Sequence, residues 1–163
     1  MSHIYRLDPV ESAFINNAPY RIKHSIEVHC SVSRMMEALS DNDQWAQWAR
    51  PIKKAVWTSA RREKNCTRDV FLIGGIFLQE VFFEWSSGTQ VSFFVETANI
   101  PGLRSFAEDH RITPLGGNRL RLDFTVAFDM TRSARWLAPA IHLALRGMVP
   151  RMLKNYKKLL ESR

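Results

Sequence analysis

The sequence has little cysteine, no long apolar run and no glycine-rich loop of the phosphate-binding kind. Its 163 residues include two cysteines, Cys30 and Cys66, which are too few for a disulfide scaffold and match no common metal-ligand spacing. No segment approaches the roughly 18 consecutive apolar residues of a membrane span, and the N-terminus lacks the apolar segment of a signal peptide. We therefore expect a cytoplasmic protein with reduced cysteines, no bound metal and no cofactor.

Acidic residues are scarce near the C-terminus. Residues 132–163 contain eight lysines and arginines against one acid, Glu161, so this segment carries the whole formal net charge of +7. Such a basic stripe is typical of the solvated face of an amphipathic helix. It also permits peripheral contact with an anionic surface. Nucleic-acid binding is disfavoured, because no aromatic face accompanies the basic residues.

The chain is rich enough in apolar residues to form a core. Hydrophobic residues make up 45% and charged residues 24%, which is ordinary globular composition, and the length fits one domain. Residues 1–19 show no clear periodicity, so we expect an irregular N-terminal arm with room for one short helical turn, followed by a single domain over residues 20–163.

Short stretches of alternating polar and apolar residues predict β-strands. The first covers residues 20–30. Two short helices should follow, one at 34–39 and one that carries Trp45 and Trp48. Turn signals then separate six further expected strands, at 52–58, 66–73, 76–85, 89–98, 103–115 and 119–130. No connection is long enough for a crossover helix, so the sheet should be antiparallel.

The period changes after the last strand. Apolar residues recur every three or four positions between about Ala134 and Glu161, which predicts one long amphipathic helix. This helix is the only expected element long enough to cover the apolar face of a seven-stranded sheet. A helix lying in the concavity of a curled sheet rarely fills it, so we expect a cavity between them.

Three sequence segments carry a family resemblance. The run SVSRMMEALSDNDQWAQWARPIKKAVW contains the two tryptophans and a final proline, CTRDVFL contains Arg68, and FLQEVFFEW contains Glu80. Over roughly residues 20–162 the chain resembles the START-like superfamily, in particular its polyketide cyclase/dehydrase and lipid-transport family. The resemblance implies an α+β helix-grip fold. In that fold a curved seven-stranded antiparallel sheet surrounds a long C-terminal helix, and two short helices follow the first strand.

Two ionisable residues share the apolar face of the strand over 103–115. Glu108 and His110 alternate with polar residues and lie on one face with Phe106 and Ile112, about 6.6 Å apart along the strand. Buried ionisable groups are costly unless they pair or meet water or ligand. The two residues are therefore interpreted either as a satisfied structural pair or as an acid–base pair facing the cavity.

Arg68 and Glu80 are further candidates for inward-facing polar groups. Arg68 alternates with Val70 and Leu72, so it should face inward. There it could contact a ligand, as the resemblance to aromatases implies, or form an ion pair with Glu80 or Glu108. Alternation alone places Glu80 outside, whereas the resemblance places it inside, and a β-bulge would reconcile the two.

We favour the inward orientation of Glu80. It would leave Phe83 and Trp85 partly exposed, as a surface on which two copies of the chain could pair. Both a monomer and a homodimer are compatible with the sequence.

The leading functional hypothesis is binding, or transport, of a small hydrophobic or aromatic molecule such as a lipid, a quinone or a polyketide-like compound. One alternative is a cyclase/dehydratase-type enzyme, in which His110 moves a proton, Glu108 orients it and Arg68 stabilises an enolate. Another is an interaction module that docks through its basic C-terminal helix. The residues expected to bind the ligand are Arg68, Phe71, Glu80, Phe93, Val95, Phe106, Glu108, His110, Phe124, Phe128, Ile141 and Met148.

Overall fold

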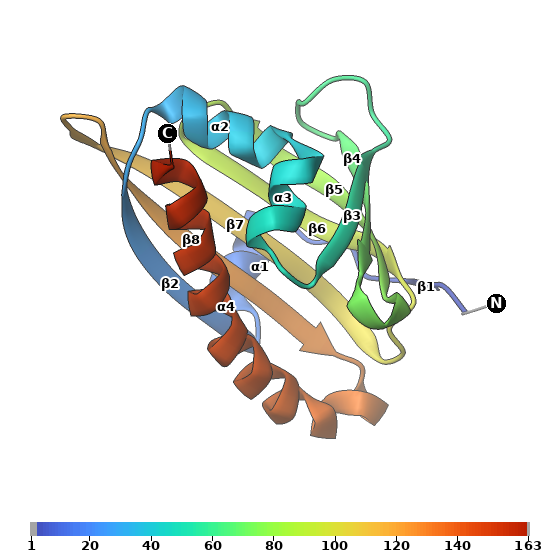
Figure 1. Ribbon diagram of the computed structural model, residues 1–163. Helices are drawn as coiled ribbons and strands as arrows, with labels where there is room; N and C mark the ends of the chain where they lie inside the picture. Colours follow the sequence, from blue (N-terminus) through green and yellow to red (C-terminus); the bar gives the residue numbers. More distant parts are fainter. Residues whose placement is uncertain (1–2, 163) are drawn as a thin grey trace.

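The computed structural model describes residues 3–162 and shows one long helix lying across the concave face of a curled antiparallel sheet (Figure 1). The main path of the sheet has the strand order β2-β8-β7-β6-β5-β4-β3. Both the seven-stranded antiparallel sheet and the α+β helix-grip fold predicted from the sequence are therefore confirmed. The strands are β2 (Tyr20–His29), β3 (Ile52–Trp57), β4 (Thr67–Leu72), β5 (Phe77–Ser86), β6 (Gln90–Ala98), β7 (Leu103–Gly116) and β8 (Arg119–Met130).

Three helices cover the concave face, where the sequence predicts them. The two short helices are α2 (Val32–Ser40) and α3 (Asn42–Trp48), and the long one is α4 (Ala138–Glu161), which follows the 3-10 helix η2 (Arg132–Leu137). None of the helices in residues 3–162 combines the length and apolarity needed to cross a membrane.

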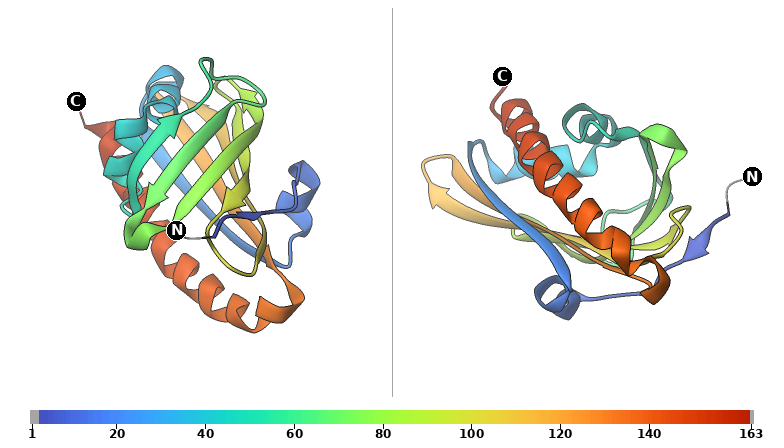
Figure 2. Two further views of the ribbon diagram at one scale, coloured as in Figure 1. Left: turned by 90° about the vertical axis from the view of Figure 1, so that its right-hand side faces the viewer. Right: turned by 90° about the horizontal axis from the view of Figure 1, so that it is seen from below.

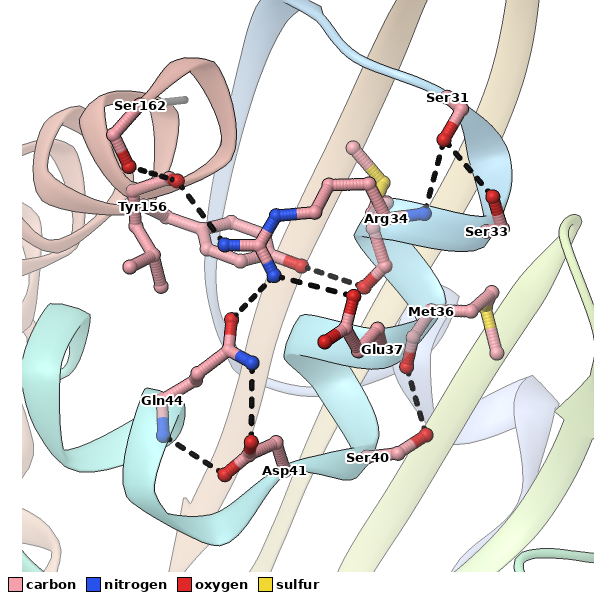
Figure 3. A network of polar contacts seen from close by, with 12 residues as sticks. Ser31, Ser33, Arg34, Met36, Glu37, Ser40, Asp41, Gln44, Tyr156 and Ser162 are labelled. Atoms are coloured by element: carbon pink, nitrogen blue, oxygen red, sulfur yellow. Dashed lines mark hydrogen bonds and ion pairs between the residues drawn. The ribbon is translucent and has the colours of Figure 1, made fainter.

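A polar network fixes α3 against both α2 and the C-terminal end of α4 (Figure 3). Asp41 caps α3, because its Oδ1 atom accepts hydrogen bonds from the backbone N–H groups of Asp43, at 2.8 Å, and Gln44, at 3.2 Å. The Arg34 guanidinium on α2 donates to Gln44 Oε1, at 2.6 Å, and to the Leu159 carbonyl on α4, at 3.3 Å. The network therefore holds the short helix that places Trp45 above the sheet.

One half of the concave face is densely packed. Leu39 of α2 and Trp45 and Trp48 of α3 are each at most 2% exposed. Trp48 stacks on Tyr156 of α4 with 4.4 Å between ring centroids, and the Tyr156 hydroxyl donates to the Met35 carbonyl. These side chains fill the space above this half of the sheet and leave the other half under the N-terminal part of α4.

The pairing of β5 with β6 has two irregularities. The first leaves Glu96 of β6 unpaired and the second leaves Phe83 of β5 unpaired, so only the second changes which side chains of β5 face inward. The register between β5 and β6 shifts between Gln79 and Glu80 and again between Phe82 and Glu84. Glu80 is buried at 3% exposure, so the inward orientation that we favoured is the one observed.

The partial exposure expected for Phe83 and Trp85 is observed for Trp85 but not for Phe83. Phe83 is 9% exposed and packs in a small apolar cluster on the convex face. The second register shift returns Trp85 to the inner side, where its ring contacts Trp57 and Phe82. Phe83 and Trp85 therefore lie on opposite faces of β5 and do not form the shared surface on which two copies were expected to pair.

The N-terminal arm is more regular than the sequence suggests. It forms β1 (Tyr5–Arg6), which pairs with β6, and α1 (Ser12–Asn17), which packs on the convex face of the sheet (Figure 2). The N–H of Leu7 donates to the Glu96 carbonyl of β6 and the N–H of Asp8 donates to the Arg104 carbonyl of β7, both at 2.8 Å. The arm thus bridges two strands where they separate.

Candidate functional site

A cavity of about 340 Å³ lies between the sheet and α4. This volume falls in the range of roughly 300–1,000 Å³ that is usual for small-molecule sites. The residues on its wall come from α3, α4, five strands and the connections around them. They are Trp45, Ala49, Pro51, Ile52, Val70, Leu72, Ile76, Leu78, Glu80, Ile100, Leu103, Phe106, Glu108, Val126, Phe128, Met130, Ile141, Leu145, Met148, Val149 and Met152.

The cavity wall is apolar except at two carboxyl groups. Glu80 of β5 and Glu108 of β7 are the two ionisable residues on the wall, and all its other members carry apolar or aromatic side chains. The strand between them, β6, places Phe93 opposite Glu108 and Val95 opposite Glu80. The polar region of the cavity therefore lies on the sheet and faces the apolar side of α4.

Glu80 forms a buried ion pair with Arg68 of β4. Its Oε2 atom lies 2.8 Å from Arg68 Nε and 2.6 Å from Nη2. The arginine has no exposed surface, and its guanidinium carbon lies 4.1 Å from the ring centroid of Trp45 and 4.9 Å from that of Trp57. Arg68 stands behind Glu80 in an aromatic box and does not belong to the cavity wall.

The ion pair determines where negative charge sits. Burial raises the pKa of Glu80, and the adjacent Arg68 opposes that rise. An arginine in a protein cannot give up its proton, so its buried charge needs the Glu80 carboxylate as counterion. We assign the negative charge of the cavity to Glu80.

Glu108 is in a different environment. Its carboxyl group forms no hydrogen bond or ion pair with any residue from 3 to 162, and the side chain is partly buried on the cavity wall. Burial raises its pKa to about 8, the negative charge of Glu80 adds to the rise, and Arg68 opposes it. At neutral pH this carboxyl group is therefore mostly protonated and can donate a hydrogen bond into the cavity.

His110 lies outside the cavity, in the packed half of the core. It is fully buried, with its ring centroid 4.7 Å from that of Phe124 and 5.9 Å from that of Trp45. Neither ring nitrogen has a hydrogen-bond partner in the described part of the chain. Burial lowers its pKa to about 4, so the ring is neutral at physiological pH.

The structure does not assemble the pair of Glu108 and His110 that the sequence suggested. Both side chains lie on the concave face of β7, as the alternation predicts. The difference arises along the strand, because Trp45 of α3 covers the sheet at His110, whereas Glu108, two residues away, faces the cavity. Strand periodicity identifies a shared face but does not show how far a covering helix extends.

The other candidate residues divide in the same way. Phe106, Phe128, Ile141 and Met148 lie on the cavity wall with the two glutamates. Three further candidates are at most 1% exposed and are packed in the core away from the wall, namely Phe93, Val95 and Phe124.

Phe71 is 40% exposed and points away from the cavity. Its neighbours Val70 and Leu72 occupy the inward positions of β4 and lie on the wall. Phe71 is therefore not a wall residue, because side chains alternate between the two faces of a strand.

Several wall residues are missing from the predicted ligand-binding residues, although the alternation along their strands indicates that they face inward. Val70 and Leu72 alternate with Arg68, and Met130 alternates with Phe128, so the period of two already places them inside. Residues 3–162 bring together no group of three or more metal-ligating side chains. The groups with which a ligand's polar atoms can interact are therefore the two wall glutamates.

Comparison with known proteins identifies the same fold and family. The model of the family described as polyketide cyclase/dehydrase and lipid transport matches residues 19–161. An uncharacterised protein of Mycobacterium tuberculosis (strain ATCC 25618 / H37Rv) is 30% identical over 165 residues, which cover 98% of this chain and 96% of that protein.

Solved structures show the same architecture at low sequence identity. A START superfamily protein from Mycobacterium smegmatis superposes with a TM-score of 0.71 at 13% identity, covering 86% of this chain and 97% of that one. The Zhui aromatase/cyclase from Streptomyces sp. R1128 gives a TM-score of 0.62 at 16% identity, covering 86% and 90% respectively. The family resemblance predicted from the sequence is confirmed.

Proposed function

This chain belongs to the polyketide cyclase/dehydrase and lipid transport family, and from that premise we propose that it binds a small, largely apolar molecule in the cavity beneath α4. The observation that carries the proposal is the cavity itself, which has about 340 Å³ of space and an apolar wall. Protein interiors normally contain few voids larger than a water molecule. A cavity of this size with an apolar wall favours an apolar ligand, because transfer of apolar surface from water into the cavity is favourable.

The test is binding of N-phenyl-1-naphthylamine, a neutral fluorescent probe of apolar sites. We expect saturable binding to the wild-type protein. The Val126→Phe substitution should reduce affinity at least tenfold, because Val126 lies on the wall opposite Glu108 in the β7–β8 register. The matched control is Val56→Phe on β3, where Val56 is absent from the cavity wall.

Both variants should keep the wild-type circular dichroism spectrum. Equal loss of binding in the two would show that the probe binds elsewhere or responds to general loosening of the fold. Unchanged binding by the Val126→Phe protein would contradict the proposal.

The enzyme alternative now depends on Glu108 and not on His110. A mostly protonated carboxyl group in an apolar cavity can act as a general acid, whereas His110 and Arg68 are buried away from the wall. If the chain is a cyclase or dehydratase, Glu108→Gln should lower the turnover of a poly-β-keto thioester at least 100-fold. Binding of the naphthylamine should persist. Turnover that survives this substitution would remove the alternative.

A second candidate function is docking to an anionic membrane surface, favoured by apolar side chains exposed within the basic segment. Trp136 of η2 is 77% exposed and Leu143 of α4 is 70% exposed. The N-terminal end of α4, which follows η2, lies at the end of the molecule opposite α2 (Figure 1). Exposed arginines accompany Trp136 and Leu143 at positions 132, 135, 146 and 151. Exposed apolar side chains together with basic ones are typical of proteins that bind the surface of an anionic membrane.

Vesicle sedimentation tests this second function. We expect binding to vesicles of phosphatidylcholine with 30% phosphatidylglycerol, weakened by salt, and none to phosphatidylcholine alone. The double variant Trp136→Ser/Leu143→Ser should weaken it at least fivefold. The control Ile73→Ser changes another exposed apolar residue, 55% exposed, outside the basic segment. Docking through this segment would be contradicted if Ile73→Ser weakened vesicle binding while the double variant did not. It would also be contradicted if the wild-type protein did not bind the vesicles.

A further inference from the structure

The two glutamates on the cavity wall impose a charge requirement on any ligand. In the part of the chain that the structure describes, Arg68 supplies the positive charge near them, and it is already paired with Glu80 and screened from the cavity by it. Among residues 3–162, no lysine, arginine or histidine belongs to the cavity wall. A carboxylate or phosphate entering the cavity would therefore meet the negative Glu80 and an apolar surface, with no counterion.

Glu108 offers a ligand a different interaction. Within the described residues its carboxyl group has no partner, although it faces a space large enough for a small molecule. Within residues 3–162, the charged group that shares the cavity wall with Glu108 is Glu80 on β5, and Arg68 on β4 acts on it from behind Glu80, while α3, α4 and β8 present apolar side chains. A protonated carboxyl group that faces an apolar cavity can donate a hydrogen bond, and leaving that donor without an acceptor costs free energy.

We propose that the cavity selects uncharged ligands that carry a carbonyl-type hydrogen-bond acceptor, which receives a hydrogen bond from the Glu108 carboxyl group, and that it rejects carboxylates and other anions. This inference rests on the proposed binding function and adds the chemical class of the ligand. The apolar body of the ligand lies against α4 and β8, and its oxygen points towards β7.

Four naphthalene derivatives of similar size test the proposal by displacement of N-phenyl-1-naphthylamine. These are 2-acetonaphthone, a neutral ketone; 2-isopropenylnaphthalene, the same shape without the oxygen; 2-naphthoate, a carboxylate; and 2-naphthylmethylamine, a cation. At pH 7 the ketone should bind about three- to tenfold more tightly than the hydrocarbon, the value of one buried hydrogen bond. The carboxylate should bind at least 100-fold more weakly than the ketone.

The pH dependence identifies Glu108 as the donor. As the pH rises through about 8, the carboxyl group loses its proton, and the ketone should lose its advantage over the hydrocarbon by pH 9.5. In Glu108→Gln the amide N–H₂ remains a donor at every pH, so the advantage should persist at pH 9.5. If Glu108 had only a structural role, the Glu108→Gln substitution would not change how the affinity difference between ketone and hydrocarbon depends on pH.

Each outcome decides between the proposals. If the hydrocarbon and ketone bind equally at pH 7, or if the carboxylate binds as well as the ketone, the selection is refuted while cavity binding stands. If the cation 2-naphthylmethylamine binds more tightly than the other three compounds, Glu108 acts as a counterion, and the proposal that the cavity selects uncharged ligands is wrong. If no naphthalene derivative and no naphthylamine binds to the folded protein, both proposals fall.

Discussion

Arg68 carries a permanent charge with none of its surface exposed to water. Glu80 contacts its Nε and Nη2 atoms and the faces of Trp45 and Trp57 cover it, whereas its Nη1 atom has no hydrogen-bond partner among the described residues. Such an arrangement costs desolvation free energy, which the pairing offsets only in part. Its effect is to fix one carboxylate on the cavity wall while keeping the positive charge out of reach of a ligand.

Removing one partner of this ion pair should be strongly destabilising. We expect Arg68→Met to lower the free energy of unfolding by about 3–5 kcal/mol, because it leaves the Glu80 carboxylate buried without a counterion. The double variant Arg68→Met/Glu80→Leu should recover most of that loss. Urea denaturation of the three proteins measures both effects. A double variant less stable than Arg68→Met would show that the pair does not act as a unit.

Glu108 predicts a specific dependence of stability on pH. Its pKa in the folded protein, about 8, lies above its unfolded value near 4.3, so the folded state holds a proton that the unfolded state releases. Between these values stability should fall with rising pH by up to about 1.4 kcal/mol per pH unit. Glu108→Gln should remove this slope.

The measurement is the free energy of unfolding of both proteins from pH 5 to pH 9. The comparison is necessary because the lowered pKa of His110 gives the opposite slope below about pH 6.5. Identical pH profiles for the two proteins would show that Glu108 titrates normally.

At the scale of the elements, the sequence predicts the strands and helices well because their periods are regular. The alternation along β8 and the three- to four-residue spacing along α4 place Phe128, Ile141 and Met148 on their inner faces without further information. β5 behaves differently. The extra residue Phe83 reverses its side-chain alternation after Phe82, and nothing in the local pattern marks where an extra residue enters a strand.

The extent of the cavity could not be predicted either. His110 and Glu108 have the same local pattern, and only the position of α3 separates the one in the core from the one on the wall. That position depends on contacts between residues distant in sequence, such as Arg34 on α2 with Leu159 on α4.

The capping of α3 gives a prediction at this scale. Asp41→Ala should lower the free energy of unfolding by about 1 kcal/mol, because two backbone N–H groups lose their acceptor. The hydrogen bond from the Gln44 side chain lowers the pKa of Asp41, so the contribution is present above the unfolded pKa of about 3.9. It should disappear as the pH falls through the folded value.

Asp43→Ala is the matched control, since this exposed acid lies in the first turn of the same helix. It should cost only about 0.3–1 kcal/mol through the helix dipole. Thermal denaturation at pH 7 and pH 3 separates the two variants. A larger loss for Asp43→Ala than for Asp41→Ala would contradict the capping role.

At the scale of the whole molecule, the cavity under α4 contributes little packing, so the stability of the curved sheet depends on the contacts made elsewhere. A cavity forgoes the contacts that a packed core would make, so the remaining layers must hold the sheet in its curved shape. The convex face contributes through α1, where Ile15 packs with Phe83, Ala107 and Ala127. The N-terminal arm therefore belongs to the structure that supports the cavity.

Leu7 tests this role of the arm. Its side chain is 3% exposed within the main core, and its N–H bonds to the Glu96 carbonyl at the point where β6 and β7 separate. Leu7→Ala should lower the free energy of unfolding by about 2–5 kcal/mol, the cost of truncating a buried leucine. Leu115→Ala, at a residue 38% exposed near the β7–β8 turn, should cost far less. If the two substitutions cost the same, the arm is an appendage, and the domain that begins at residue 20 holds its curvature without it.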